Sequence, residues 1–125
     1  MISALAIARV AFGLFFAGSA LLKLGATDTM VTMLSGAGFE RPLPFVYLAS
    51  VAQMAAGAAL VSGRLVRPAA FGLIAYVAVV NWYLHPFWVL DGEAASIQFQ
   101  LFTKNLGIMA GLLAVAGAHY GTRHD

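Results

Sequence analysis

The residues whose side chains are most able to bind a ligand or react lie where long apolar segments begin or end. Lys23 closes the first segment, Asn81 and His85 close the third, and Lys104 and Asn105 open the fourth. If these segments are antiparallel helices, the three ends meet at one level, and we expect Lys23, His85 and Lys104 to converge on one cavity. Two lysines, a histidine and two amides form a positively charged mouth, which suits a small anion or a quinone oxygen.

Aromatic residues accompany these polar groups. The HPFW stretch places Trp88 three residues after His85, and Phe102 lies just before Lys104. We therefore include Trp88 in the lining of the predicted cavity, where it would pack against a bound ring. The alternative is that these aromatic residues form a belt at the membrane interface and that the lysines reach into the lipid headgroups.

A second polar layer is expected toward the opposite end of the helices. Counting along antiparallel segments puts Arg9, Gln53 and Tyr76 at a similar depth. No Asp or Glu lies within any apolar segment, so we predict that Arg9 hydrogen-bonds to Gln53, directly or through water. Polar groups at membrane depth mark either a function or a specific pairing. The layer is therefore a clamp between helices or a contact for an anion or a quinone oxygen.

The amino-acid composition indicates which secondary-structure elements carry these residues. Hydrophobic residues make up 62% of the chain and charged residues 10%, whereas soluble domains have about half and about a quarter. A helix that crosses a bilayer needs about 20 apolar residues. The sequence predicts a single all-α membrane domain, an antiparallel bundle of four transmembrane helices over residues 1–125, with spans at about 2–22, 44–61, 68–84 and 99–120.

The loop after the first span has a helical pattern of its own. The stretch TDTMVTMLSGAG begins with a capping residue at Thr27 or Asp28, and glycines follow at 36 and 38. Apolar residues at 30, 31, 33 and 34 give it one hydrophobic face. We predict a short amphipathic helix at the membrane surface that covers the mouth of the bundle.

Lysine and arginine in short loops predict the orientation. The link SGRLVRP carries Arg64 and Arg67, and the C-terminal tail carries Arg123. With four spans, this link and both termini share one side. We predict that this side is the cytoplasm and that, in a bacterium, the chain lies in the inner membrane with the predicted mouth facing outward.

The sequence lacks the residues that several kinds of functional site require. Without cysteine there is no thiol redox centre, iron–sulfur ligation or covalent haem attachment. His85 and His119 should lie on opposite sides of a bilayer about 30 Å thick, so they cannot ligate one haem iron. The basic residues form no patch or stripe of the kind that binds nucleic acid. We expect no haem, no metal and no catalytic motif that is sufficient alone, and we leave open whether the chain is part of an enzyme.

Small residues recur at helix-packing spacing. They form the pairs Gly13/Ala17, Ala52/Ala56 and Gly107/Gly111. Such pairs let membrane helices approach closely. We interpret them as packing within the bundle; the alternative is a dimer face. The remaining apolar surface contacts lipid, or a partner in a homo-oligomer or a larger membrane complex.

Ordered motifs along the chain resemble the DoxX family of small four-helix membrane proteins. These motifs are RVAFGLFFAGSALLKL, the G-F-x-R-P-x-P loop, GAALVSGRLVRPAA, and HPFW followed by FTKNLGIMAGLL. The resemblance places the family's first-helix arginine at Arg9, its helix-end lysine at Lys23, its loop arginine at Arg67 and its K-N pair at 104–105. Family members usually carry a glutamate where this chain has Gln53.

The resemblance implies redox and quinone chemistry at the membrane. Some relatives are subunits of a thiosulfate:quinone oxidoreductase, and others are linked to quinone resistance or to redox-stress complexes. Three functions stay open: a subunit that binds a quinone or a small sulfur oxyanion at the predicted mouth, a non-catalytic anchor or assembly subunit, and a small-solute carrier.

Overall fold

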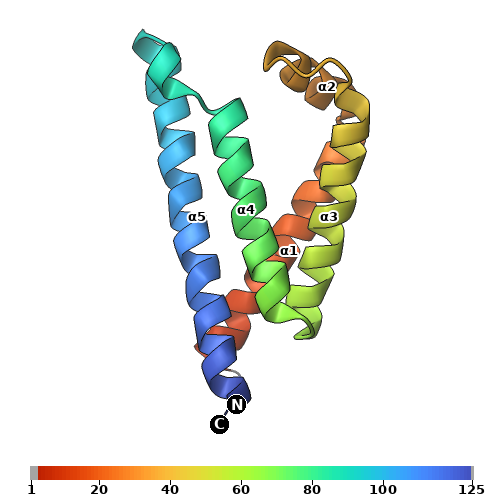
Figure 1. Cartoon of the computed structure of the whole chain (residues 1–125), viewed down its shortest axis with the longest axis vertical. Helices are drawn as coiled ribbons and strands as arrows, with labels where there is room; N and C mark the ends of the chain where they lie inside the picture. The colour runs from red at the N-terminus through yellow and green to blue at the C-terminus, as the bar shows by residue number, and fades with distance from the viewer. Residues whose placement is uncertain (1–2, 125) are drawn as a thin grey trace.

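Residues 3–124, the part of the chain that the structure describes, form four long α-helices and one short one (Figure 1). The computed structural model describes the backbone of residues 3–124 and the side chains of residues 3–119. The elements are α1 (Ala4–Gly25), α2 (Thr27–Gly36), α3 (Pro42–Ser62), α4 (Val66–Leu84), the 3-10 turn η1 (Phe87–Val89) and α5 (Gly92–His124). Four of them, α1, α3, α4 and α5, are long and apolar enough to span a membrane. The predicted fold class is therefore confirmed, including the short helix α2 in the first loop.

The bounds differ most at α5. The sequence predicts that this helix begins near residue 99, but it begins at Gly92. Glu93 stands in its first turn, where a carboxylate stabilises the positive end of the helix dipole. Gln98 and Gln100 are therefore helical, and Lys104 lies about three turns inside the helix. The predicted start of the first span at Ile2 and the Arg123 side chain lie outside the described part of the structure.

The long helices form two pairs that meet at one end only. α1 packs along α3, and α4 packs along α5. The main hydrophobic core joins the pairs near the termini; its residues are Phe16, Leu60, Val66, Ala70, Leu73, Val77, Leu112, Val115 and Ala116. Away from this core α3 and α4 diverge, and α2 lies across the far end of α3 (Figure 1). We call the two ends of the bundle the terminal end and the α2 end.

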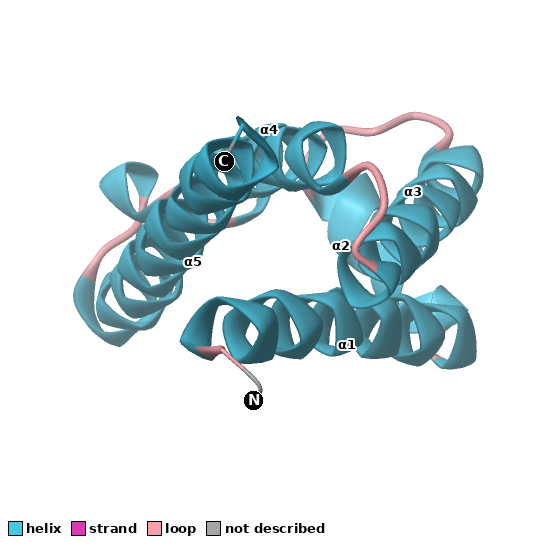
Figure 2. Cartoon of the chain, turned by 90° about the horizontal axis from the view of Figure 1, so that it is seen from below, coloured by secondary structure: helices cyan, strands magenta, loops and turns pink. Residues whose placement is uncertain are grey.

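Two glycines bring α1 and α3 into backbone contact. A Cβ atom added to Gly57 would lie 2.7 Å from the carbonyl oxygen of Gly13, and one added to Gly13 would lie 2.7 Å from the carbonyl oxygen of Gly57. Small residues permit such approaches between membrane helices. Seen from the terminal end, α1 lies along one side of the bundle, beside α3 (Figure 2). The contact fixes the register that decides which polar residues of the two helices meet.

Candidate functional site

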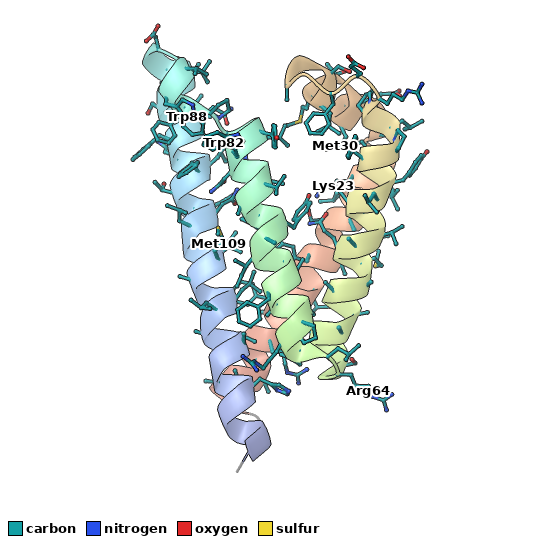
Figure 3. All side chains as sticks on the ribbon, in the orientation of Figure 1. Lys23, Met30, Arg64, Trp82, Trp88 and Met109 are labelled. Carbon is teal, nitrogen blue, oxygen red and sulfur yellow. The ribbon has the colours of Figure 1, made fainter. Side chains whose placement is uncertain are left out.

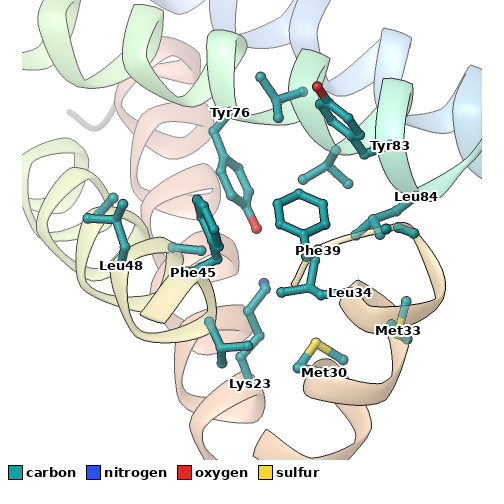
Figure 4. A pocket seen from close by; sticks show the side chains of 17 residues that line it. Lys23, Met30, Met33, Leu34, Phe39, Phe45, Leu48, Tyr76, Tyr83 and Leu84 are labelled. Atoms are coloured by element: carbon teal, nitrogen blue, oxygen red, sulfur yellow. The ribbon is translucent and has the colours of Figure 1, made fainter. Parts of the chain in front are cut away.

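A cavity of about 670 Å³ lies between the diverging halves of α3 and α4 (Figure 4). Its walls come from α1, α3 and α4, and α2 contributes Met30, Met33 and Leu34. The lining is mostly aliphatic and aromatic. Among the described residues that line it, Lys23 is the one with a charged side chain. We call this space the Lys23 cavity.

Neutral acceptors from two helices hold the Lys23 ammonium. Its Nζ atom donates to Oε1 of Gln53 at 2.7 Å and to Oγ of Ser19 at 2.9 Å. It also lies 5.9 Å from the centroid of the Tyr76 ring. Gln53 is only 2% exposed, and no acidic side chain of the described residues pairs with Lys23. The cavity therefore holds a positive charge that is solvated by hydrogen bonds without being neutralised.

Side-chain direction explains this arrangement. Long side chains on a helix point back toward its N-terminus. The Lys23 stem therefore carries its ammonium back one turn, to the level of Ser19 and toward Gln53. Figure 3 shows Lys23 pointing into the space between α3 and α4. The depth of the charge thus differs from the depth of the backbone that carries it.

Arg9 does not meet Gln53. Its Nη1 donates to the carbonyl oxygens of Leu60 and Val61, the latter at 3.2 Å. These groups belong to the last turn of α3, where carbonyls lack partners within the helix. Arg9 thus caps α3 from a neighbouring helix and offsets the negative end of its dipole. The α1–α3 register, which the sequence does not reveal, places Arg9 closer to the helix end than predicted.

The prediction that Arg9, Gln53 and Tyr76 form one inner layer is therefore wrong, because Arg9 lies apart from the other two. Gln53 and Tyr76 face Lys23, while Arg9 stands at the terminal end of α3. Lys23 thus occupies the place in this layer that was predicted for Arg9.

Other predicted site residues join α4 to α5 instead of lining the cavity. Asn81, which is 3% exposed, donates from Nδ2 to the carbonyl of Phe102 at 3.1 Å and accepts from Nδ2 of Asn105 at 2.8 Å. One turn further, Nδ1 of His85 lies 2.7 Å from Oε1 of Gln98. Such hydrogen bonds hold membrane helices together.

The two residues of the K-N pair point in different directions. Asn105 faces Asn81, but Lys104 is exposed, because neighbouring residues on a helix differ by about 100° in direction. Trp88 packs against Trp82 and Phe102 at the α2 end. The predicted convergence of Lys23, His85 and Lys104 is therefore wrong: of the six residues assigned to the mouth, only Lys23 lines the cavity. Ligand binding by these residues stays a prediction.

The DoxX family model matches residues 4–86. This chain belongs to the DoxX family. With four helices able to cross a bilayer, it is an integral membrane protein of the DoxX type. The match covers α1 to α4, and so every wall of the Lys23 cavity, but it stops before Lys104 and Asn105. No curated protein and no solved structure matches the chain.

Several residues in or beside the Lys23 cavity of this DoxX protein were not assigned a role from the sequence. Phe39, in the turn after α2, packs edge-on against Phe45 and Tyr83. Ser19 accepts from Lys23; the spacing of four residues between them was a usable signal, because such residues share a helix face. Phe39 and Tyr83 gave no comparable signal, since aromatic residues are frequent throughout the chain.

Proposed function

We propose that this DoxX protein is a membrane subunit of a redox system and that it binds a quinone in the Lys23 cavity. The observation that carries the proposal is one ammonium group in an otherwise apolar, aromatic cavity. A quinone has a flat apolar ring with carbonyl oxygens at its edge. The ring fits between aromatic side chains such as Phe45 and Tyr83, and one oxygen can accept from Lys23. The redox role rests on the family resemblance.

The cavity favours a quinone over a small sulfur oxyanion. A dianion that leaves water needs several donors, because an unpaired charge in an apolar site is costly. Besides Lys23, the side chains with donors in the lining are Tyr76 and Tyr83. The volume of about 670 Å³ also falls within the range of about 300–1,000 Å³ that is typical of small-molecule sites.

The packing does not favour a solute carrier. Toward the terminal end the cavity gives way to the hydrophobic core, where Leu60, Leu73 and Leu112 are buried together. A path across the membrane would have to pass through these side chains. An anchor subunit needs no ligand in the cavity, and binding measurements therefore separate it from the proposed function.

Replacing Lys23 by methionine should weaken quinone binding about ten- to a hundredfold, the usual contribution of a charged hydrogen bond at about 1.5–3 kcal/mol. Methionine keeps most of the side-chain volume, so the cavity should persist. Binding would be measured by titrating a short-chain benzoquinone into detergent-solubilised protein. Quinone retained after mild purification would be quantified by mass spectrometry.

Lys104→Met provides the matched control, since Lys104 is exposed and outside the cavity. Its effect should stay below about threefold, as for exposed charged pairs. Equal affinity in the parent and both variants would remove Lys23 from the proposed site. A parent protein that neither retains nor binds quinone would favour the anchor subunit instead.

We also propose that the terminal end faces the cytoplasm of a bacterium and that the chain lies in its inner membrane. The cation-rich link between α3 and α4 supports this orientation. The chain has no cysteine, so single cysteines can be labelled cleanly at two exposed positions: Ser62, where α3 ends, and Asp91, just before α5 begins. A membrane-impermeant maleimide should label Asp91→Cys in intact cells and should label Ser62→Cys only after lysis. The reverse pattern would invert the orientation.

A further inference from the structure

We infer that the ligand enters the Lys23 cavity sideways from the bilayer, through an opening between α3 and α4, and that its apolar tail stays in that opening. The inference rests on the proposed function for the quinone head at Lys23. It adds the route of entry and the class of ligand, which is an amphiphile with a polar head and a hydrocarbon or isoprenoid tail.

The rim of the cavity identifies the opening. On α3, Leu48 and Ala52 are one turn apart; on α4, Val79 and Tyr83 are one turn apart. All four line the cavity and are also exposed, Leu48 at 66% and Val79 at 54%. Side chains that both line a cavity and stay exposed stand at its edge. Both pairs lie within membrane-spanning helices, so this edge meets lipid and not water.

Protein covers the other sides. α1 forms the wall that carries Lys23, and the hydrophobic core closes the terminal end. At the α2 end, Phe39 packs against Phe45 of α3 at 5.0 Å and Tyr83 of α4 at 5.6 Å between ring centroids. It thereby bridges the two diverging helices, beside Leu34 and Met30 of α2 (Figure 4). A ligand from water would have to pass this apolar cover.

The chemistry along the opening matches a tail. Besides Lys23, the polar side chains of the lining are Tyr76 and Tyr83, and the other three rim residues, Leu48, Ala52 and Val79, are aliphatic. A hydrocarbon chain in this position exchanges lipid contacts for protein contacts without exposing polar atoms. A small anion has no apolar part that could occupy this opening.

The test narrows the opening without touching the head site. Ala52→Trp and Val79→Trp fill the rim from α3 and α4. Their neighbours Val51 and Ala78 are exposed to lipid and do not line the cavity, so Val51→Trp and Ala78→Trp are matched controls. Each protein is reconstituted in phosphatidylcholine vesicles that contain either a long-tailed isoprenoid quinone or a tail-less benzoquinone. Equal thermal midpoints would confirm that each variant is folded.

The rim variants should lower occupancy by the long-tailed quinone about tenfold or more, because the tryptophan ring would occupy the space assigned to the tail, and overfilling that space is unfavourable. The rim variants should bind the tail-less quinone within about threefold of the parent, and the control variants should bind both quinones within the same range, as expected for surface substitutions. If the rim variants load long-tailed quinone as the parent does, lateral entry is wrong while the proposed quinone site survives.

If the parent binds no quinone, the proposed function fails, and native mass spectrometry of co-purified lipid then tests the opening by itself. Lipid that is retained by the parent and the controls but lost from both rim variants would support lateral entry with a membrane lipid as the occupant. Lipid that is absent from the parent, or retained equally by all variants, would overturn the inference.

Discussion

Replacing Gly57 by leucine should lower the free energy of unfolding by about 3 kcal/mol or more, at the upper end of the cost of overpacking. The first side-chain carbon would lie 2.7 Å from the carbonyl oxygen of Gly13 and 3.0 Å from the backbone nitrogen of Ala17. Both are backbone atoms of α1, so a side-chain rotation cannot relieve the contact. The whole of α1 has to move away from α3. Thermal or denaturant unfolding in a mild detergent would measure the loss.

Gly72→Leu is the matched control, because nothing lies within 4 Å of a Cβ atom at Gly72. That change should be neutral or stabilise the protein by up to about 1 kcal/mol, since glycine is a poor helix former. If both variants unfold like the parent, α1 and α3 do not approach as closely as the structure places them. The helix register that brings Lys23 to Gln53 would then no longer be supported.

Replacing Gln53 by leucine should cost about 1.5–3 kcal/mol of stability, because Lys23 loses an acceptor 2.7 Å away in a buried setting. Removing both partners should cost much less, since neither Lys23 nor Gln53 is then left without the other. The double variant Lys23→Met/Gln53→Leu should therefore recover most of the loss. A double-mutant cycle of unfolding free energies would measure the coupling.

The conservative variant Gln53→Glu is the control for Gln53→Leu, because it keeps an acceptor for Lys23. A carboxylate at this position can pair with Lys23 and competes with a ligand oxygen for the ammonium, since charge-assisted hydrogen bonds are about twice as strong as neutral ones. The variant should fold normally and bind quinone about tenfold more weakly. Additive effects of the two single substitutions would show that Lys23 and Gln53 do not interact.

The sequence predicts the helices of this protein far better than the contacts between them. Apolar length and loop composition are local properties, and they are sufficient to predict the four long helices and α2. Contacts such as Lys23–Gln53 depend on the register and rotation of one helix against another. In a membrane both faces of a helix are apolar, so the hydrophobic pattern that orients a surface helix is weak.

The K-N pair illustrates this limit. Adjacent in the chain, Lys104 and Asn105 looked like one polar element, but Asn105 joins α5 to α4 while Lys104 faces outward. Their separation depends on the rotation of α5, which no local signal gives. Lys23 illustrates a second limit, because counting residues locates its backbone and not the ammonium at the end of a long stem.

The main hydrophobic core lies toward the terminal end, and this position affects how the protein can evolve. Nine buried residues at that end hold the two helix pairs together, and the wall of the Lys23 cavity at the other end is mostly half-buried or exposed. Substitutions in that wall remove few of the contacts that maintain the fold. Selection can therefore alter the shape of the cavity, position by position, while the scaffold that presents Lys23 is inherited intact.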